Sequence, residues 1–419
     1  MTEIEPGRSD VARGTSRLAF DAIEQVSHIV EAMHANIAAA SSPFGEGTNG
    51  RTRGIPALVY GSTRLVNGVS RSVLDRALRV LPGQSASSLS RPRADAMRSA
   101  LNGVLGDHLL ATANPLAIPM RLRRNGRPLT LEREALADAI PETSGKILVV
   151  VHGLCMNDRL WNRNNHDHAS ALARDRGYTP VYLHYNSGRH VSENGRELAA
   201  LLERLVDTWP VPVSDLSVLA HSMGGLITRS ACHYALEDAL EDVCEGGVES
   251  GAKGGHRWLA ALRRIVFLGT PHHGAPLERG GHSLMTALGI SPYTAPLARL
   301  GWLRSAGITD LRYGNLLDED WQPHDRFASS IGDLRRPVSL PEGVECYALA
   351  ASTGKLRGDL NDRLLGDGLV PVASALGQHR EATKSLPISE SHRAVSYGTN
   401  HMDLLSDPDV YAQLRDWHS

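Results

Sequence analysis

One serine has the surroundings that nucleophilic catalysis needs. It lies in Leu219-Ala220-His221-Ser222-Met223-Gly224-Gly225, where an apolar run ends and a segment of helical periodicity begins. A nucleophile on a sharp strand-to-helix turn needs small residues two positions before and after it, because larger side chains would collide. Ala220, in place of the more usual glycine, and Gly224 meet this need. The pattern predicts Ser222 as the nucleophile, with a helix N-terminus beside the developing oxyanion.

A second apolar run leads into a His-Gly pair. Val149-Val150-Val151 is followed by His152-Gly153-Leu154. We predict that the backbone N–H groups of Leu154 and Met223 are the two donors of an oxyanion hole. His152 is a residue type that serves as a base, but its place at the end of an early strand favours a structural, hydrogen-bonded role.

The nucleophile also needs an acid and a base, which we expect later in the chain in the order Ser, Asp, His. Asp367 lies between two glycines, and His401 lies in a loop before the terminal helix. We predict that His401 takes the serine proton and returns it to the leaving group, while Asp367 fixes the tautomer of the imidazole. The alternative acids are Asp359 and Asp362, and the alternative base is His392.

Other polar residues have side chains of the types that bind metals or do redox chemistry. Asn165-His166-Asp167-His168 has metal-ligand types, but adjacent residues at a helix start do not face one another, and no third ligand has matching spacing. Asp403 is a candidate for reinforcing its loop or holding a cation, although a helix N-cap is the simpler interpretation. The cysteines show no CxxC spacing, so we expect free thiols. The sequence therefore predicts no cofactor and no metal.

The elements that must position these residues alternate between buried strands and amphipathic helices. Short apolar runs separated by helical segments predict a mostly parallel sheet with helices on both faces. A hairpin with the turn Asn125-Gly126 precedes this sheet. The predicted strands are Ile147–Val151, Val181–Leu183, Leu216–Ala220, Ile265–Leu268 and Val344–Leu349, and the predicted helices include Gly195–Trp209 and Leu226–Leu240.

Two regions depart from this alternation. Residues 1–115 show helical periodicity over Phe20–Ile37, Leu58–Leu81 and Met97–Leu110, and they predict a helical N-terminal region separate from a domain over 116–419. Residues from about 277 to 330 mix apolar helical pieces with Gly and Pro, which predicts a helical cap over the pocket. The alternative is a rigid helical excursion packed on the sheet. The expected substrate-facing residues of the cap are Leu284, Met285, Leu288, Leu297 and Leu300.

Composition limits the partners of the protein. A formal net charge of −2 over 419 residues carries no signature of nucleic-acid or anionic-membrane binding. The basic stretch Arg121, Arg123, Arg124 and Arg127 is interpreted as a solvated strand face. No apolar run reaches the roughly 18 residues of a membrane span, and the N-terminus does not have the pattern of a secretory signal, so we expect a cytoplasmic location. The N-terminal helices are a candidate surface for a partner or for self-association.

The combined motifs resemble the esterase and lipase branch of the α/β-hydrolases. They are similar both to bacterial triacylglycerol lipases and to the GPI inositol-deacylase-like group, from about Ile147 to the C-terminus. The motifs are His152-Gly153-Leu154, Ala220-His221-Ser222-Met223-Gly224, Gly269-Thr270-Pro271-His272-His273-Gly274, Gly366-Asp367-Gly368 and Asn400-His401.

This resemblance implies an α/β-hydrolase fold with Ser222, Asp367 and His401 as the triad and the amides of Leu154 and Met223 as the oxyanion hole. It also implies that the loop with His272 and His273 supports the site without doing chemistry. Some bacterial lipases hold a calcium with an aspartate where Asp403 stands, but we identify no second calcium aspartate.

The expected activity is hydrolysis of carboxylic esters, with lipid-like or acyl esters as small-molecule substrates, through an acyl-serine intermediate. An acyltransferase, a thioesterase or an amidase would use the same residues. The alternative from another class is a non-catalytic binding protein with this fold.

Overall fold

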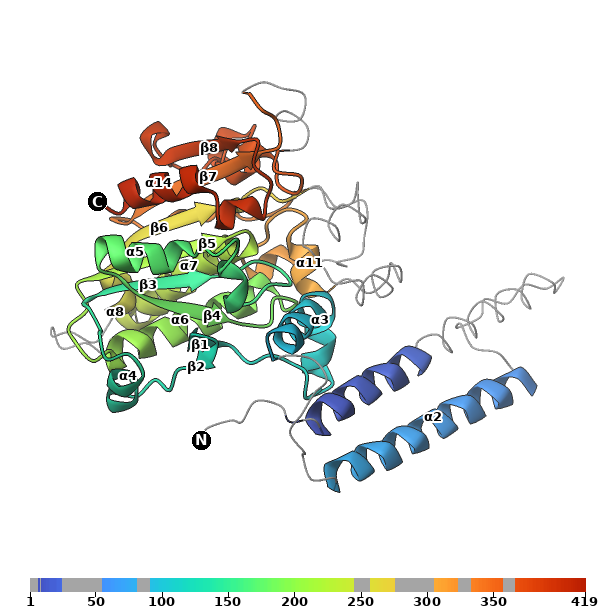
Figure 1. Ribbon diagram of the computed structural model, residues 1–419. Helices are drawn as coiled ribbons and strands as arrows, with labels where there is room; N and C mark the ends of the chain where they lie inside the picture. Colours follow the sequence, from blue (N-terminus) through green and yellow to red (C-terminus); the bar gives the residue numbers. More distant parts are fainter. Residues whose placement is uncertain are drawn as a thin grey trace. The chain divides into compact units, whose positions relative to one another are not determined.

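The computed structural model describes residues 7, 9–24, 55–80, 91–244, 257–275, 305–322, 333–356 and 366–419. In these ranges eight strands form one sheet in the order β2-β1-β4-β3-β5-β6-β7-β8 (Figure 1). The first two strands are antiparallel to their neighbours, and the other six run parallel. The strands are β1 (Arg121–Arg124), β2 (Arg127–Pro128), β3 (Lys146–Val151), β4 (Thr179–His184), β5 (Asp215–His221), β6 (Leu262–Leu268), β7 (Glu345–Ser352) and β8 (Arg393–Tyr397).

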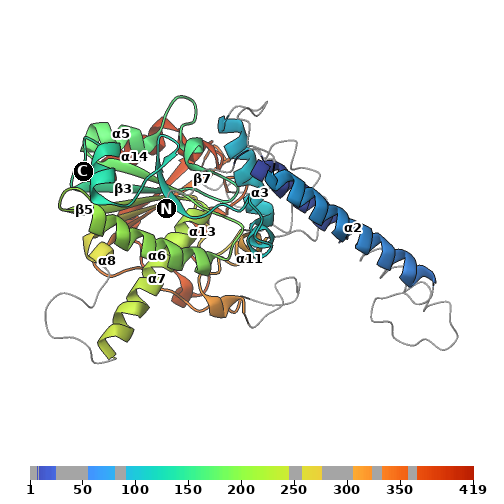
Figure 2. The ribbon, with the colours of Figure 1, turned by 90° about the horizontal axis from the view of Figure 1, so that it is seen from below.

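Helices cover both faces of this sheet. Besides the helix over residues 9–24, the helices of the described ranges are α2 (Ile55–Val80) in the other unit, and α3 (Arg91–Ala111), α4 (Arg133–Ala139), α5 (His168–Arg176), α6 (Val191–Thr208), α7 (Met223–Cys244), α8 (Arg257–Ala261), α11 (Ala306–Asp310), α13 (Val372–Ala375) and α14 (Pro408–Trp417). Figure 2 shows α5 and α14 on one face, and α6, α7 and α8 on the other. The predicted mostly parallel sheet with helices on both faces is therefore confirmed.

The five strands predicted from apolar runs are all present, because a strand covered on both faces must be apolar along its whole length. Strand β8 was not predicted. It lies at the edge of the sheet, and each of its residues is only partly buried. Its sequence, Arg-Ala-Val-Ser-Tyr, consequently contains no continuous apolar run.

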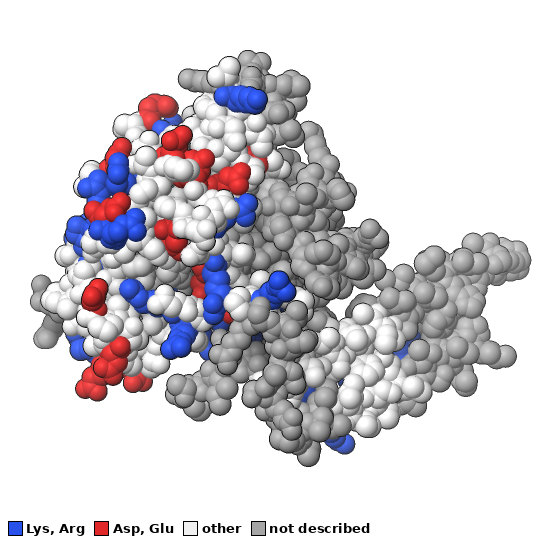
Figure 3. Space-filling view, in the orientation of Figure 1, with Lys and Arg blue, Asp and Glu red and all other residues white. Residues whose placement is uncertain are grey.

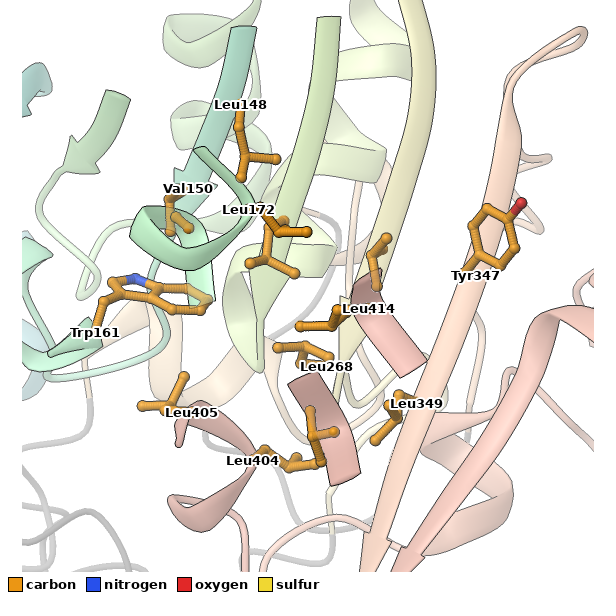
Figure 4. Close-up of a cluster of buried hydrophobic side chains, with 14 of the residues drawn as sticks. Leu148, Val150, Trp161, Leu172, Leu268, Tyr347, Leu349, Leu404, Leu405 and Leu414 are labelled. Atoms are coloured by element: carbon orange, nitrogen blue, oxygen red, sulfur yellow. The ribbon is translucent and has the colours of Figure 1, made fainter. Parts of the chain in front are cut away.

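A hydrophobic cluster under α5 and α14 fixes the sheet to these helices (Figure 4). Leu148 and Val150 are two residues apart on β3, so they face the same side of the sheet. Both are fully buried with Leu172 of α5, Leu268 of β6 and Leu414 of α14. Burying a leucine or valine side chain stabilises a fold by about 1.5–3 kcal/mol, so the cluster makes the sheet a rigid support for the loops at its edge.

Contacts between residues divide the chain into two units. One contains Met1–Arg91 and Leu109–Ala117, and the other contains Pro92–His108 and Ile118–Ser419. Most of helix α3 thus belongs to the unit that contains the sheet. The predicted domain boundary near residue 115 stays a prediction.

In the first unit, residues 9–24 form a helix that pairs with α2. Arg17 donates from Nε and Nη2 to the two carboxylate oxygens of Asp75, at 2.8 and 3.0 Å. Asn67 Nδ2 donates to the carbonyl of Phe20 at 2.9 Å. The predicted helices over Leu58–Leu81 and Met97–Leu110 correspond to α2 and α3, whereas residues 25–37 of the first predicted helix lie outside the described residues.

The predicted hairpin is present, but its arginines do not all lie on a solvated face. Asn125 and Gly126 form the turn with φ of 52° and 71°. Arg123 is only 3% exposed, and its Nη1 lies 3.2 Å from Asp158 Oδ1 and 3.5 Å from Asp95 Oδ2. The interpretation as a solvated face was therefore wrong for Arg123. Strand β1 is interior to the sheet, and a buried guanidinium requires acidic partners.

The described surface carries both signs of charge. On the face in Figure 3, basic and acidic side chains are intermixed over the described atoms. Within the described ranges no helix has the length and apolar character needed to cross a membrane. The expectations of no nucleic-acid partner, of a cytoplasmic location and of association through the N-terminal helices stay predictions.

The predicted cap is described only in part. Residues 305–322 contain α11 and a 3-10 helix over Asp318–Asp320, and Leu311, Leu316 and Leu317 are buried there. Both the cap and the alternative of a rigid helical excursion packed on the sheet stay predictions. The five substrate-facing residues expected for the cap lie outside the described residues.

Candidate active site

Ser222 occupies the turn between β5 and α7. Its φ is +55°, a left-handed conformation that a residue with a side chain rarely adopts. Its N–H donates to the carbonyl of Leu268 at 2.8 Å, which ties the turn to the end of β6. A Cβ on Gly224 would lie 2.5 Å from the Val151 carbonyl oxygen, so only glycine fits two positions after the serine. The sharp turn predicted from the small neighbours is present, and it keeps a strained serine at the carboxyl edge of the sheet.

Asp367 and His401 form a buried pair. His401 Nδ1 lies 2.6 Å from Asp367 Oδ2, and the two side chains are 1% and 0% exposed. The other carboxylate oxygen, Oδ1, accepts the N–H groups of Leu369 at 2.9 Å and Val370 at 2.8 Å. Because a carboxylate only accepts, the imidazole carries its proton on Nδ1. The carboxylate is thereby fixed in orientation, and it fixes the imidazole in turn.

The imidazole of His401 lies beside the residues that flank Ser222. His221 Nε2 donates to the His401 carbonyl at 3.1 Å, and the two rings are 4.6 Å apart. A Cβ on Gly269, the residue after β6, would lie 3.2 Å from His401 Cε1. His401 Nε2 is buried and has no hydrogen-bond partner in the described part of the chain. The nitrogen that would accept a serine proton is therefore unoccupied.

Ser222 Oγ and His401 Nε2 are not hydrogen-bonded among the described residues. Such bonds are often long in free enzymes and tighten when substrate binds. The structure thus brings Asp367 and His401 into direct contact, and it brings His401 against the two strand ends that hold Ser222.

The loop of residues 152–156 lies against Ser222. A Cβ on Gly153 would be 2.9 Å from Ser222 Cβ, so the absence of a side chain allows this close approach. Leu154 follows directly and is buried. Met223 is the first residue of α7, where backbone N–H groups have no partner within the helix. The two amides predicted as oxyanion donors therefore belong to segments next to the serine. Leu154 follows the glycine that contacts Ser222, and Met223 follows Ser222 directly.

The segment that follows β4 holds the 152–156 loop in place. Tyr185 Oη donates to the His152 carbonyl at 2.8 Å, and the Cys155 N–H donates to Ser187 Oγ at 3.0 Å. His152 Nδ1 donates to the Gly153 carbonyl at 2.8 Å, and its ring stacks on Tyr185 at 4.3 Å. Burial lowers the pKa of His152 to about 4. His152 is thus a neutral, hydrogen-bonded residue of the loop, as predicted.

The loop after β6 contains a buried histidine followed by a half-buried one. His272 is fully buried, and burial together with Arg229 lowers its pKa well below the ordinary value. Burial lowers the pKa of His273 to about 4, and its N–H donates to Ser374 Oγ at 3.0 Å. Both histidines are therefore neutral near pH 7, and their supporting role stays a prediction.

The alternative acid and base differ in what the structure describes. Asp359 and Asp362 lie outside the described residues. His392 ends a 3-10 helix immediately before β8, and its ring lies 4.1 Å from that of Tyr347. The start of β8 pairs with Ala348, which aligns through Phe267 with Ala220, so His392 lies three strands to the side of the β5 end that bears Ser222. This position separates His392 from the candidate nucleophile.

The histidine-rich segment before α5 forms hydrogen bonds instead of a metal site. His166 Nε2 lies 2.8 Å from His168 Nδ1, and His168 Nε2 donates to the Leu404 carbonyl at 2.9 Å. Asp167 caps α5 by accepting the Ser170 N–H at 2.8 Å. Among the described residues no cluster of three or more His, Cys, Asp or Glu could hold a metal ion. Cys155, Cys232 and Cys346 are free.

The N-cap interpretation of Asp403 was wrong. Asp403 is the first residue of a 3-10 helix, and its Oδ1 lies 3.4 Å from Arg163 Nη2. Asn400 Oδ1 accepts the N–H groups of Met402 at 2.9 Å and Asp403 at 3.0 Å, at the turn that leads into this helix. Asn400 therefore shapes the turn around His401, a contribution that the sequence analysis missed. The signal was available, because asparagine side chains favour such turns.

Comparison with known proteins gives matches only at the level of structure. No family model and no curated protein matches the sequence. The mature lipase BlEst2 of Bacillus licheniformis is similar with 16% identity and a TM-score of 0.41, over 65% of this chain and 92% of that chain. The Staphylococcus hyicus lipase is similar with 15% identity and a TM-score of 0.36, over 66% of this chain and 94% of that chain.

The chain has the α/β-hydrolase fold. The evidence is its own topology: a parallel sheet with an antiparallel start, and a strained serine between β5 and α7. The predicted fold class is confirmed. A third similar structure, lipase 1 of Pelosinus fermentans, has 13% identity and a TM-score of 0.38, over 66% of this chain and 98% of that chain.

Proposed function

We propose that this α/β-hydrolase is a serine esterase, with Ser222 as nucleophile, His401 as base and Asp367 as acid. The observation that carries the proposal is the buried Asp367–His401 pair. His401 Nε2 has no hydrogen-bond partner among the described residues, and the imidazole lies at the edge of the sheet that holds Ser222. A histidine fixed by a carboxylate beside a serine on a strained turn is the arrangement that activates a hydroxyl.

The reaction proceeds through two acyl transfers. Ser222 Oγ attacks the ester carbonyl carbon while its proton passes to His401 Nε2. The tetrahedral intermediate then expels the alkoxide, which takes the proton from Nε2 and leaves as the alcohol. Water, deprotonated by the same nitrogen, attacks the acyl-serine, and the acid departs as Ser222 regains its proton. Asp367 stabilises the imidazolium in both halves.

The backbone amides of Leu154 and Met223 stabilise the charge on the carbonyl oxygen in each tetrahedral intermediate. The contact of Gly153 with Ser222 and the position of Met223 at the start of α7 support this assignment. The positive end of the helix dipole adds to the stabilisation. A single oxyanion donor is worth about 10²–10³ in kcat in enzymes of this mechanism.

The proposed substrates are small-molecule carboxylic esters, with lipid-like or acyl esters favoured by the sequence motifs. Thioester cleavage, amide cleavage and acyl transfer to an alcohol would use the same steps with another leaving group or acceptor. A binding protein without activity differs in kind, since it has no need of an activated serine.

The test is the substitution Ser222→Ala, assayed with p-nitrophenyl esters from acetate to long acyl chains. We expect kcat to fall by about 10⁴-fold or more with the fold retained, because the attacking oxygen is removed. Ser391→Ala, at an exposed serine, is the matched control and should leave kcat unchanged. Substantial turnover by a folded Ser222→Ala protein would overturn the proposal.

A further inference from the structure

Helix α3 contacts the 152–156 loop through its backbone. A Cβ on Gly103 would lie 2.2 Å from Cys155 Sγ and 2.8 Å from both the N and the Cα of Cys155. Cys155 has a φ of +61°, a left-handed conformation that is unfavourable for a residue with a side chain. The surrounding contacts must therefore hold the loop in this conformation, and α3 provides one of them.

Helix α3 also contacts the turn of residues 186–188, which is hydrogen-bonded to the 152–156 loop. A Cβ on Gly188 would lie 2.1 Å from the Asn102 carbonyl oxygen, and a Cβ on Gly106 would lie 1.8 Å from Asn186 Oδ1. Asn186 Nδ2 donates to the Gly106 carbonyl at 2.8 Å. The turn of residues 186–188 contains Ser187, whose hydroxyl accepts the Cys155 N–H. Helix α3 thus touches the loop directly and also touches the segment that supports it.

Helix α3 is kinked between the glycines that make these contacts. Leu105 has a φ of −128° and a ψ of 15°, which are not helical values. On either side of it, the carbonyls of Gly103 and Gly106 accept side-chain hydrogen bonds from Ser305 Oγ, at 2.6 Å, and from Asn186. Ala306 N–H donates to Asp107 Oδ2 at 3.0 Å, so α3 also anchors the start of α11. The kinked helix is integrated with the sheet unit by backbone contacts that tolerate little displacement.

We propose that helix α3 positions the 152–156 loop for catalysis, and that Gly103 is the positioning residue at the contact. The inference rests on the proposed function, in which the Leu154 amide binds the oxyanion. Leu154 precedes Cys155 directly, so a displacement of Cys155 moves the peptide bond that carries the proposed oxyanion donor. A shift of about 1 Å in a catalytic group can cost about 10²-fold in rate. The part of α3 that belongs to the sheet unit thereby contributes to a site whose residues all come later in the sequence.

The test is Gly103→Ala in the full chain. We expect kcat for p-nitrophenyl butyrate to fall about 10- to 100-fold, because the new methyl group displaces Cys155 and with it the Leu154 amide. KM should change little, because an oxyanion hole binds the charged intermediate more strongly than the neutral ester. A trifluoromethyl ketone forms a tetrahedral adduct with its oxyanion in the hole, so its affinity should fall by the same factor as kcat. A purely structural role would not link these two losses.

The matched control is Gly68→Ala in α2, where a Cβ meets no atom within 4 Å. Its kinetic constants should equal those of the wild type, and its helix should gain about 1 kcal/mol at most. A second variant, Ser187→Ala, removes the hydroxyl that accepts the Cys155 N–H and introduces no clash. We expect it to lower kcat by about 10-fold, again with unchanged KM.

The outcomes separate this inference from the proposed function. A wild-type protein that neither hydrolyses esters nor reacts with a phosphonate contradicts the proposed function and, with it, this inference. An active wild type whose folded Gly103→Ala variant keeps its kcat and its ketone affinity contradicts this inference alone. Should Gly103→Ala fail to fold, Ser187→Ala decides, and full activity of that variant overturns the inference.

Discussion

Two buried aspartate–histidine pairs in the sheet unit have similar chemistry and different surroundings. His401 Nδ1 lies 2.6 Å from Asp367 Oδ2, and its Nε2 has no partner in the described residues. His190 Nδ1 lies 3.1 Å from Asp310 Oδ2, and its ring lies flat on that of Trp321 at 3.6 Å. The first pair meets the strand ends that hold the strained serine, whereas the second joins the start of α6 to the residues around α11.

The comparison teaches that an aspartate beside a histidine does not by itself define a catalytic pair. Asp310 is held much as Asp367 is, since its Oδ2 accepts the Val191 N–H at 2.8 Å and its Oδ1 accepts from Asn315 at 3.3 Å. Burial raises the pKa of the Asp310 carboxyl. What differs is the group that each imidazole faces. An imidazole stacked on an indole joins two segments, whereas one beside a nucleophile can move a proton.

The largest expected effect is on activity, and it comes from substituting the histidine of each pair in turn. His401→Ala should lower kcat/KM for p-nitrophenyl esters by about 10⁴-fold, because no other group can take the serine proton. His190→Ala should keep activity within about threefold of the wild type but lower the free energy of unfolding by about 1–3 kcal/mol, since Asp310 loses a buried partner.

Steady-state kinetics and urea unfolding of both variants check this expectation. The reverse pattern, with an inactive His190→Ala and an active His401→Ala, would mean that we have assigned the wrong pair to catalysis.

A smaller effect concerns histidines that have no paired carboxylate and instead donate to backbone carbonyls. His152, His168 and His418 bond to the carbonyls of Gly153, Leu404 and Leu414, and burial lowers the pKa of each to about 4. Between pH 6.5 and 4 the unfolded chain binds protons that the folded chain does not. The free energy of unfolding should therefore decrease as the pH is lowered through this window, by up to about 1.4 kcal/mol per pH unit for each histidine.

Urea denaturation at pH 7.5, 6 and 5 measures this dependence. We expect the midpoint to fall continuously toward acid, and a midpoint that does not change between pH 7 and pH 5 would show that these imidazoles are protonated in the folded protein.

Much of the site could be predicted because its signals are local in sequence. The apolar run before Ser222 and the small residues around it describe a turn that sterics dictate, and the turn is present with a φ of +55°. Asp367 between two glycines and His401 before the last helix were named from position alone, and the two side chains are in contact.

The remaining features depend on contacts between residues far apart in the chain, which no local pattern records. The sequence around Gly103 is that of an ordinary helix, but its carbonyl accepts from Ser305 Oγ and a Cβ on it would collide with Cys155. The sequence predicts a solvated Arg123 because alternation identifies the two faces of a strand but not the residues that cover each face. Its acidic partners lie 28 and 35 residues away.

The most direct test of the central claim is labelling with a fluorescent alkyl phosphonate, located by mass spectrometry of peptides. The probe carries fluoride on phosphorus: an activated serine attacks the phosphorus and expels fluoride as the base takes its proton, whereas an ordinary hydroxyl does not react. The account predicts that Ser222 alone is modified, that His401→Ala suppresses the labelling, and that His190→Ala labels as fast as the wild type. Failure of the wild type to react, or modification of another serine at the same rate, would contradict the account.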